Sequence, residues 1–337
     1  MLYILFKVRG VFLEFNDIIG QESIKKSLMS ALKKNNISHA YIFNGESGLG
    51  KRTMANIFSK KILCENKEVN KCECKSCLLF ENGTNPDFFA LKPDGSSISV
   101  EQIRDMNKDV IVKPLYNKKK VFVIHDAEKM TIQAQNALLK TLEEPPEYVV
   151  IILITNNLNM LLETIQSRAI KYNFKKNSNA QIKSYIKKMY GDDVENIDFL
   201  VTYSNGKIGS VDDIIKSDEI IEIREKIINC VINLKKMKRT EIIEISDFFI
   251  ENKDNIEGIL NIMMMLYRDL LILKETDDVV LLTNIDKKDI LISKKNEFSC
   301  NELIKNIDVV TQSIEYAKRN TNFTLLIEVM LQRLQGE

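Results

Sequence analysis

The sequence predicts an α/β domain followed by an all-α region, in which a parallel sheet with helices on both faces comes first. Short apolar runs alternate with stretches of helical periodicity through the first half of the chain. These runs, such as residues 121–124, are continuously apolar, as expected of strands that are buried on both faces. After about Lys175 strand-like runs largely disappear, and amphipathic helical segments follow.

Each element of the first domain follows from periodicity and from turn residues. Asp17 is expected to cap the first helix, and Pro145 ends the last one because proline cannot continue a helix. The expected helices are residues 21–34, 51–63, 99–107 and 131–144, and the expected strands are 41–43, 121–124 and 149–154. The apolar residues 1–13, interrupted by Lys7 and Arg9, are either an extra edge strand or an extension ahead of a domain that starts at Glu14.

The helical region falls into two parts. Short helices are expected at residues 179–190, 197–203 and 210–216, and longer ones at 219–236, 241–252, 255–275, 300–319 and 323–334. We therefore expect three domains: an α/β domain at 1–175, a small helical lid at 176–217 and a helical collar at 218–337. The apolar face of the collar helix at 255–275 could bury an internal core alone, or a core and a neighbouring subunit.

Composition limits the functions to be considered. A chain of 337 residues with 45% hydrophobic residues can build two or three cored domains. Lys and Arg number 48 against 47 Asp and Glu, so any nucleic-acid contact must be local or shared with partner chains. No apolar run approaches the roughly 20 residues of a membrane span. No targeting segment is recognisable, so we expect a cytoplasmic protein whose six cysteines stay reduced.

A glycine-rich turn between a strand and a helix predicts a phosphate-binding loop, in which backbone amides and the helix N-terminus hold phosphates. Lys51 would reach the terminal phosphates. The next position should be a Ser or Thr that ligates Mg²⁺, but it is Arg52, and Thr53 comes one residue too late. The residues placed at this degenerate loop are Gly45, Gly48, Gly50, Lys51, Arg52 and Thr53.

The acidic pair of a nucleotide site is also altered. After the strand at 121–124, His125 stands where a metal-binding Asp is needed, and imidazole is a poor ligand for Mg²⁺. Asp126 stands where a longer Glu would activate water. We therefore expect negligible hydrolysis at this site, whereas ATP or ADP binding without hydrolysis stays open.

Four cysteines follow the phosphate-loop helix with the spacing C-x₇-C-x-C-x₂-C. Four thiolates close together in a reducing compartment favour a tetrahedral structural zinc ion, held by Cys64, Cys72, Cys74 and Cys77. Two alternatives stay open: a vestigial module of free thiols, or a site that one cysteine fails to join. Four ligands leave no open position, so a catalytic metal is not expected.

One stretch is specific enough to identify a family. QNALLKTLEEPP at residues 135–146 resembles a signature of the AAA+ subunits of bacterial DNA polymerase III clamp loaders. The strand before the phosphate loop, Ser167-Arg168 and the end segment Asn320-Thr321-Asn322 are similar to the same family, which also carries a zinc module after the phosphate-loop helix. The family spacing there is C-x₈-C-x₂-C-x₂-C, so this chain is two residues shorter.

The resemblance implies a pentamer in which neighbouring subunits share each ATP site. With its altered loop, this chain resembles the member that hydrolyses no ATP itself and completes the neighbour's site. Arg168 matches the arginine supplied in trans, although Ala169 replaces the usual Cys after it. Alternatives are a surface ion pair for Arg168, an ATP-hydrolysing motor subunit of the same assembly, or an unrelated P-loop kinase.

The resemblance also implies partners. These are gamma/tau-type and delta-type clamp-loader subunits in a hetero-pentamer, the sliding clamp and primed DNA, with no membrane partner. Arg104 and Lys140 match positions that contact the DNA backbone. Each would contribute one salt-sensitive phosphate contact, and each taken alone could equally be a solvated helix residue.

Overall fold

The computed structural model describes residues 7–8, 11–12, 14–66, 72–192, 194, 196–215, 218–317, 319 and 322–336. Contacts within the chain group it into two compact units. The first comprises Met1–Ile182 with Lys207–Gly209, and the second comprises Lys183–Gly206 with Ser210–Glu337. The expected division after residues 175 and 217 stays a prediction, and Lys216, like Asn320 and Thr321 of the end segment, lies outside the described residues.

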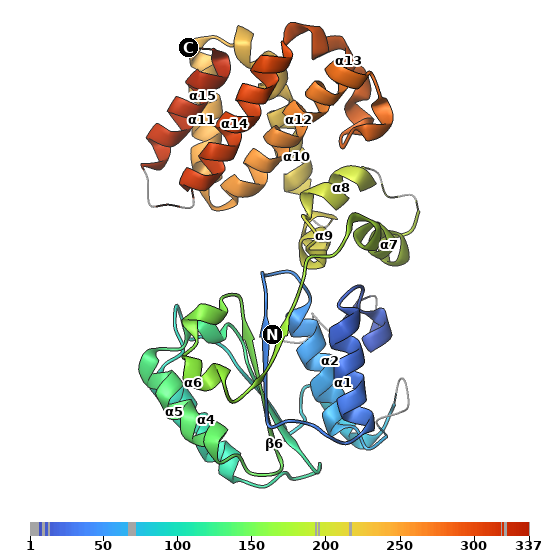
Figure 1. The fold of residues 1–337 in the computed structure, drawn as a ribbon, viewed down its shortest axis with the longest axis vertical. Helices are drawn as coiled ribbons and strands as arrows, with labels where there is room; N and C mark the ends of the chain where they lie inside the picture. Colours follow the sequence, from blue (N-terminus) through green and yellow to red (C-terminus); the bar gives the residue numbers. More distant parts are fainter. Residues whose placement is uncertain are drawn as a thin grey trace. The chain divides into compact units, whose positions relative to one another are not determined.

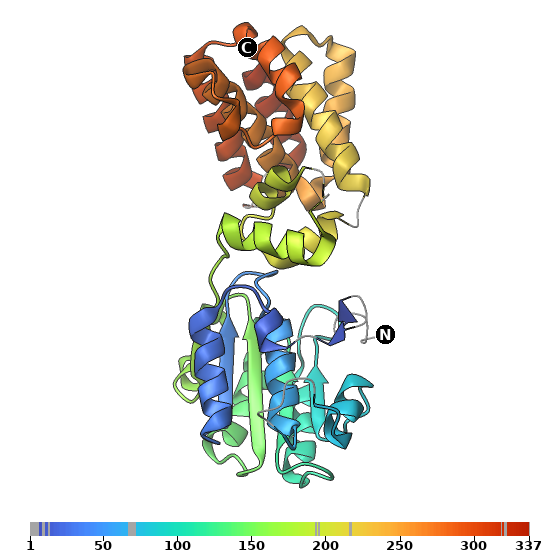
Figure 2. The same ribbon diagram turned by 90° about the vertical axis from the view of Figure 1, so that its right-hand side faces the viewer.

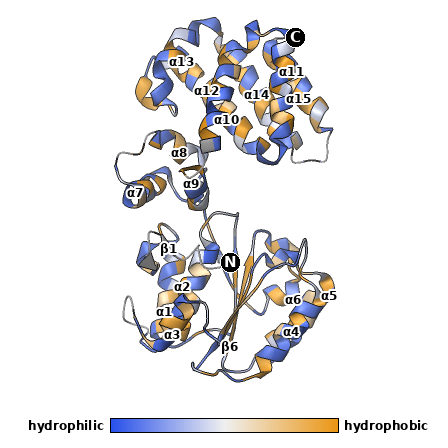
Figure 3. Ribbon diagram, turned by 180° about the vertical axis from the view of Figure 1, so that it is seen from behind, coloured by the Kyte–Doolittle hydropathy of each residue, from blue (hydrophilic) through white to orange (hydrophobic). Residues whose placement is uncertain are grey.

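The first unit is built on a parallel sheet of five strands in the order β4-β5-β6-β3-β7. The strands are β3 (Ala40–Asn44), β4 (Phe88–Leu91), β5 (Lys120–Ile124), β6 (Val149–Thr155) and β7 (Ile170–Asn173). All three expected strands are confirmed. The central one, β6, is buried along its whole length and is continuously hydrophobic in Figure 3. The sequence did not predict β4 and β7, which have four residues each and line the two edges.

Alternate residues of each strand face two different cores. Tyr41 and Phe43 pack with α1 (Glu22–Lys33) and α2 (Lys51–Leu63). Ala40 and Ile42 point the other way, into a core formed with α4 (Val100–Ile111) and α5 (Ile132–Glu143). Figures 1 and 2 show the two helix layers on either side of the sheet. This arrangement is the expected α/β layering, and it leaves the carboxyl ends of the strands at one edge.

Local capping signals explain two helix starts of the first unit. Ser99 caps α4 in a reciprocal pair with Gln102, and Thr131 caps α5. The expectation that Asp17 caps the first helix is wrong. Its carboxylate accepts from the backbone N–H of Glu14 at 2.9 Å within a 3₁₀ turn, and α1 begins only at Glu22.

Smaller elements complete the first unit. The helices α3 (Lys75–Glu81) and α6 (Glu163–Gln166) were not predicted, and both are short. Near the N-terminus, β1 (Lys7–Val8) and β2 (Val11–Phe12) pair with each other in antiparallel orientation. Within the described part of residues 1–13, no strand joins the five-stranded sheet, so the expected edge strand is not found there. Among the described residues, 3₁₀ turns lie at Phe15–Asp17, Ala127–Lys129, Leu158–Met160, Leu234–Lys236, Lys253–Asn255, Val279–Leu281, Ile285–Lys287 and Lys295–Glu297.

The regular elements described in the second unit are all helical. They are the greater part of α7 (Asn179–Tyr190), α8 (Ile197–Tyr203), most of α9 (Ile208–Ile215), α10 (Asp218–Asn233), α11 (Arg239–Glu251), α12 (Ile256–Thr276), α13 (Lys288–Lys294), α14 (Cys300–Ala317) and α15 (Phe323–Gln335). In α12 the face that includes Ile259, Ile262 and Leu266 is completely buried within the chain. That face is therefore an internal core, and it is not available to a neighbouring subunit.

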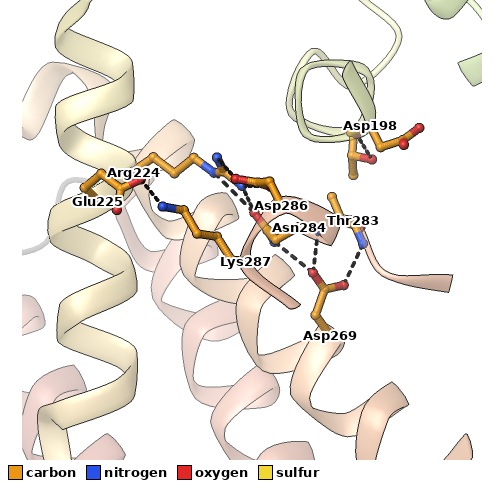
Figure 4. Close-up of polar contacts among 9 residues, drawn as sticks. Asp198, Arg224, Glu225, Asp269, Thr283, Asn284, Asp286 and Lys287 are labelled. Carbon is orange, nitrogen blue, oxygen red and sulfur yellow. Dashed lines mark hydrogen bonds and ion pairs between the residues drawn. The ribbon is translucent and has the colours of Figure 1, made fainter. Parts of the chain in front are cut away.

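A polar network built on the buried residues Arg224 and Asp269 joins three parts of the second unit (Figure 4). The guanidinium of Arg224 on α10 contacts both carboxylate oxygens of Asp286, at 2.7 and 2.9 Å, and the side chain of Asn284. It also lies 4.3 Å from the ring centre of Phe199 on α8. Asp269 on α12 is fully buried and accepts from the backbone N–H groups of Thr283 and Asn284. None of the described helices is both long and apolar enough to cross a membrane.

Candidate functional site

The glycine-rich loop lies between β3 and α2, as the sequence predicts. Gly45 and Gly50 adopt φ values of +147° and +87°, and Gly50 is the residue from which α2 starts. A Cβ atom added at Gly45 would lie 2.9 Å from the backbone oxygen of Phe174, so this position has no room for a side chain. The loop therefore has the backbone path of a phosphate-binding loop.

Lys51 is directed back into the loop. Its ammonium donates to the backbone oxygens of Gly45 and of Glu46, the latter at 2.6 Å, and to Oδ1 of Asn156 at 2.9 Å. The residue is 5% exposed, and burial is the main cause that lowers the pKa of Lys51 to about 8. A bound phosphate would have to compete with these three acceptors for the ammonium.

Arg52 and Asp126 come together although 74 positions separate them in sequence. Nη2 of Arg52 donates to both carboxylate oxygens of Asp126, at 2.8 and 2.9 Å. These are the residues at the positions of the metal-ligating hydroxyl and of the water-activating carboxylate. The guanidinium of Arg52, whose side chain is about half exposed, therefore lies against this carboxylate, while Thr53 lies half-buried in the first turn of α2.

His125 is placed at the end of β5, as expected, but it faces a buried environment. The residue is 5% exposed, and its Nδ1 atom makes no hydrogen bond within the described part of the chain. Burial first, and then the charges of Arg52 and Lys92, lower the pKa of His125 to about 4. The imidazole is therefore neutral at pH 7.

Two acidic residues of this region were not singled out by the sequence reasoning. Glu128 accepts from both the backbone N–H and the side-chain amide of Asn156, at 3.2 and 2.9 Å. Glu46 forms ion pairs with Lys207 at 2.8 Å and with Lys176 at 3.4 Å. The hydrogen bond from Lys207 is the main cause that lowers the pKa of Glu46. Glu128 could have been noticed as a second acid two residues after Asp126, but no local pattern indicates the partners of Glu46.

A segment distant in sequence also contacts the phosphate loop. The backbone N–H of Gly209 donates to the backbone oxygen of Gly48 at 3.0 Å. A Cβ atom at Gly209 would lie 3.1 Å from the Cα of Gly48, so the approach favours glycine. The cation that this segment brings to the loop is Lys207, which forms an ion pair with Glu46.

Arg168 lies on the surface of the first unit, just after α6. Its Nη2 atom is 2.8 Å from Oε1 of Glu143, and its Nη1 atom donates to the backbone oxygen of Thr164 at 2.8 Å. About a third of the side chain is exposed. In the single chain Arg168 therefore forms a surface ion pair, which was one of the alternatives that the sequence left open.

The two residues expected to contact DNA lie on neighbouring helices. Arg104 is exposed on α4 and Lys140 is exposed on α5. The helices are joined by Asn107, whose side chain donates to the backbone oxygen of Ala137 at 3.0 Å and accepts from Thr141. Both cations therefore belong to one packed layer.

The four cysteines of the insert converge. Their sulfur atoms all lie within 4.8 Å of one another, and Cys64, Cys72 and Cys77 are buried. Cys64 ends α2, and Cys74 and Cys77 lie at the start of α3. Tetrahedral zinc with Zn–S bonds of about 2.3 Å requires sulfur atoms about 3.8 Å apart, so this donor set fits that ion. The cluster could hold a metal ion, and residues 67–71 of the connecting segment lie outside the described residues.

Comparison with known proteins assigns the chain to a family. A family model for the DNA polymerase III delta subunit matches residues 20–178, and a model for its C-terminal region matches residues 218–336. The chain is 31% identical to DNA polymerase III subunit delta′ of Bacillus subtilis, over 77% of this chain and 78% of that protein. It is also 40% identical to DNA polymerase III subunit tau of the same organism. That alignment covers 48% of this chain and 29% of the tau subunit.

A solved structure of a gamma subunit-related protein from Thermotoga maritima aligns with 92% of this chain and 98% of that chain, at 18% identity and a TM-score of 0.44. The two family models together match most of the sequence, and the delta′ relative aligns over more than two thirds of both chains. The chain therefore belongs to the bacterial DNA polymerase III delta-prime family of clamp-loader subunits.

Proposed function

We propose that this clamp-loader subunit is a scaffold of the delta-prime type, which hydrolyses no ATP itself and supplies Arg168 to the ATP site of a neighbouring subunit. The observation that carries the proposal is the ion pair between Arg52 and Asp126. Phosphoryl transfer depends on a metal ion that neutralises the phosphates and on a free carboxylate that orients water. Here the carboxylate is bound by a guanidinium, and the two positions that should ligate the metal hold Arg52 and His125.

The alternative is an ATP-hydrolysing motor subunit of the gamma/tau type, favoured by the 40% identity with a tau subunit. Mg²⁺-dependent ATP turnover by the reconstituted clamp loader, with and without Lys51→Ala in this chain, separates the two functions, because an isolated motor subunit would also lack its neighbour's arginine. The scaffold proposal predicts that Lys51→Ala leaves the turnover of the assembled complex unchanged. A marked loss of turnover in the correctly assembled Lys51→Ala complex would establish the motor function instead.

The trans role of Arg168 is supported by its chemistry. A guanidinium can stabilise the negative charge that develops on a transferred phosphoryl group, and such residues contribute roughly 10³–10⁵ in rate where they act. Releasing Arg168 from Glu143 is inexpensive, because exposed ion pairs are worth about 0–1 kcal/mol. The side chain can therefore exchange a carboxylate of its own chain for a neighbour's phosphate.

The proposed partners are other clamp-loader subunits in a hetero-pentamer, the sliding clamp and primed DNA. Arg104 and Lys140 would contact the DNA backbone without reading its sequence. The charges exposed on α4 and α5 support this role, which predicts that replacing both lowers DNA affinity and makes it less sensitive to salt.

We further propose that Cys64, Cys72, Cys74 and Cys77 hold a structural zinc ion. The convergence of four sulfur atoms supports it, because a closed set of four thiolates is typical of structural zinc. The metal would fasten α3 to the end of α2. ATP or ADP held at the phosphate loop would remain unhydrolysed.

A further inference from the structure

A group of buried charges lies beside the cysteine cluster. Lys60 and Lys61, near the end of α2, are each 5% exposed. The ammonium of Lys60 is 2.7 Å from Glu81 and 3.5 Å from Glu14, and that of Lys61 is 2.8 Å from Glu14. Burying a charge costs free energy unless an opposite charge lies beside it. Replacing any one of these residues should therefore change the stability of the charged groups around it.

The ion pair between Lys60 and Glu81 connects the same two helices that position Cys64 and Cys77. Cys64 follows Lys60 by four residues at the end of α2, and Glu81 follows Cys77 by four residues in α3. Residues four apart on a helix are neighbours on its surface. Burial lowers the pKa of Lys60, but Glu81, Glu14 and Cys77 outweigh it and raise that pKa. Lys60 and Glu81 thus lie one helical turn along α2 and α3 from Cys64 and Cys77.

We propose that Lys60 is the counter-charge of the metal-bound cysteines, and that Glu81 weakens this effect. The inference rests on the zinc ion proposed above. Zn²⁺ with four thiolates carries a net charge of −2, and three of the four cysteines are buried. A nearby ammonium stabilises the thiolates, and with them the metal-loaded state. The carboxylate of Glu81 opposes that stabilisation, because it attracts the same ammonium and repels the thiolates.

Two substitutions that break the same ion pair separate this electrostatic role from a packing role. Lys60→Met removes the cation and is expected to weaken zinc binding by about 10- to 100-fold, the usual effect of losing a group that supports metal ligands. Glu81→Gln removes the anion and leaves Lys60 with Glu14, so it is expected to tighten zinc binding. If the ion pair only held α3 against α2, both substitutions would weaken binding.

The experiment measures zinc affinity of the full chain by competition with a chromophoric chelator. The absorption spectrum of the cobalt-substituted protein verifies four-thiolate coordination in each variant. Lys60→Arg keeps the charge and is expected to retain most of the affinity. Lys25→Met is the matched control, because it removes another buried cation of the first unit, which lies on α1 and pairs with Glu22.

The outcomes are separable. Weaker binding for Lys60→Met and tighter binding for Glu81→Gln, with little change for Lys25→Met, would support the proposal. Unchanged affinity in Lys60→Met, or weaker binding in both Lys60→Met and Glu81→Gln, would overturn it while leaving the zinc site intact. A wild-type chain that binds no zinc would instead refute the zinc proposal itself. If Lys60→Met does not fold, Glu81→Gln still tests the proposal, which predicts that this variant binds zinc more tightly. Lys60→Arg then tests whether a positive charge at this position is enough to keep the zinc affinity.

Discussion

The guanidinium of Arg52 lies against the carboxylate of Asp126, with Nη2 at 2.8 and 2.9 Å from its two oxygens. The pair links the start of α2 to the end of β5, which are the two places from which a nucleotide site draws its metal ligands. In the scaffold proposal, this ion pair takes the place of the metal-dependent arrangement that phosphoryl transfer requires.

Restoring the metal ligands should restore metal dependence. In the double variant Arg52→Thr/His125→Asp, a hydroxyl and a carboxylate return to the positions where Mg²⁺ is normally held. We expect this variant to bind ADP more tightly with Mg²⁺ than with EDTA, by tenfold or more in equilibrium dialysis. The wild-type chain and an Arg104→Thr control should show no such Mg²⁺ effect. A Mg²⁺ effect of equal size in the wild-type chain would contradict this account.

His125 should make stability depend on pH. The pKa of His125 is lowered to about 4 in the folded chain, so the unfolded chain binds more protons between pH 4 and about 6.5. Stability therefore rises with pH across this window, and His125 contributes about 2 kcal/mol that is lost between pH 7 and pH 5. Urea unfolding at both pH values should show a smaller loss in His125→Gln. Equal losses in the two proteins would show that His125 stays ionisable at its ordinary pKa.

The cysteine cluster should bind one zinc ion per chain. Elemental analysis of protein purified without added metal measures this directly. Chelation, or Cys77→Ser, should lower the thermal stability of the first unit because metal binding contributes to folding. Cys230→Ser is the control, since Cys230 is a buried cysteine of the second unit. Metal-free protein whose melting temperature does not respond to zinc would refute the site.

The network around Arg224 should be important for the stability of the second unit. Arg224→Met leaves Asp286 and Asn284 without their buried partner, and we expect a loss of about 3 kcal/mol in the free energy of unfolding. Arg268→Met is the comparison, because the side chain of Arg268 is about half exposed and should cost less than about 1 kcal/mol. Equal effects of the two substitutions would argue against a special role for Arg224.

The sequence predicted the long elements because their periodicity extends over many residues. The helix at 51–63 is confirmed to the residue, and the boundaries of α12 are within one residue of the prediction. In contrast, β4 and β7 have only four residues each and lack the continuous apolar run of a central strand. Asp17 misled the prediction because Asp can cap either a helix or a turn, and here it caps a 3₁₀ turn.

The sequence indicated which residues differ from those expected at a nucleotide site, but it did not indicate which contacts these residues make. The prediction that Arg52 and His125 replace metal ligands rests on their positions in the sequence alone, and it stays a prediction. That Arg52 would pair with Asp126, or Glu46 with Lys207, depends on contacts between residues 74 or more positions apart. The pairing of Arg168 with Glu143 likewise joins the segment after α6 to the end of α5. Such pairs follow from the path of the chain and have no local sequence signal.

The central claim is that Arg168 acts on a neighbour's ATP. The most direct test is the rate of ATP hydrolysis by the reconstituted clamp loader on primed DNA, with this subunit carrying Arg168→Ala. Glu143→Gln is the matched control, since it breaks the same surface ion pair but keeps the guanidinium. We predict a loss of about 10³-fold or more at the ATP site that Arg168 faces, with little change for Glu143→Gln. An unchanged rate in a correctly assembled Arg168→Ala complex would contradict the claim.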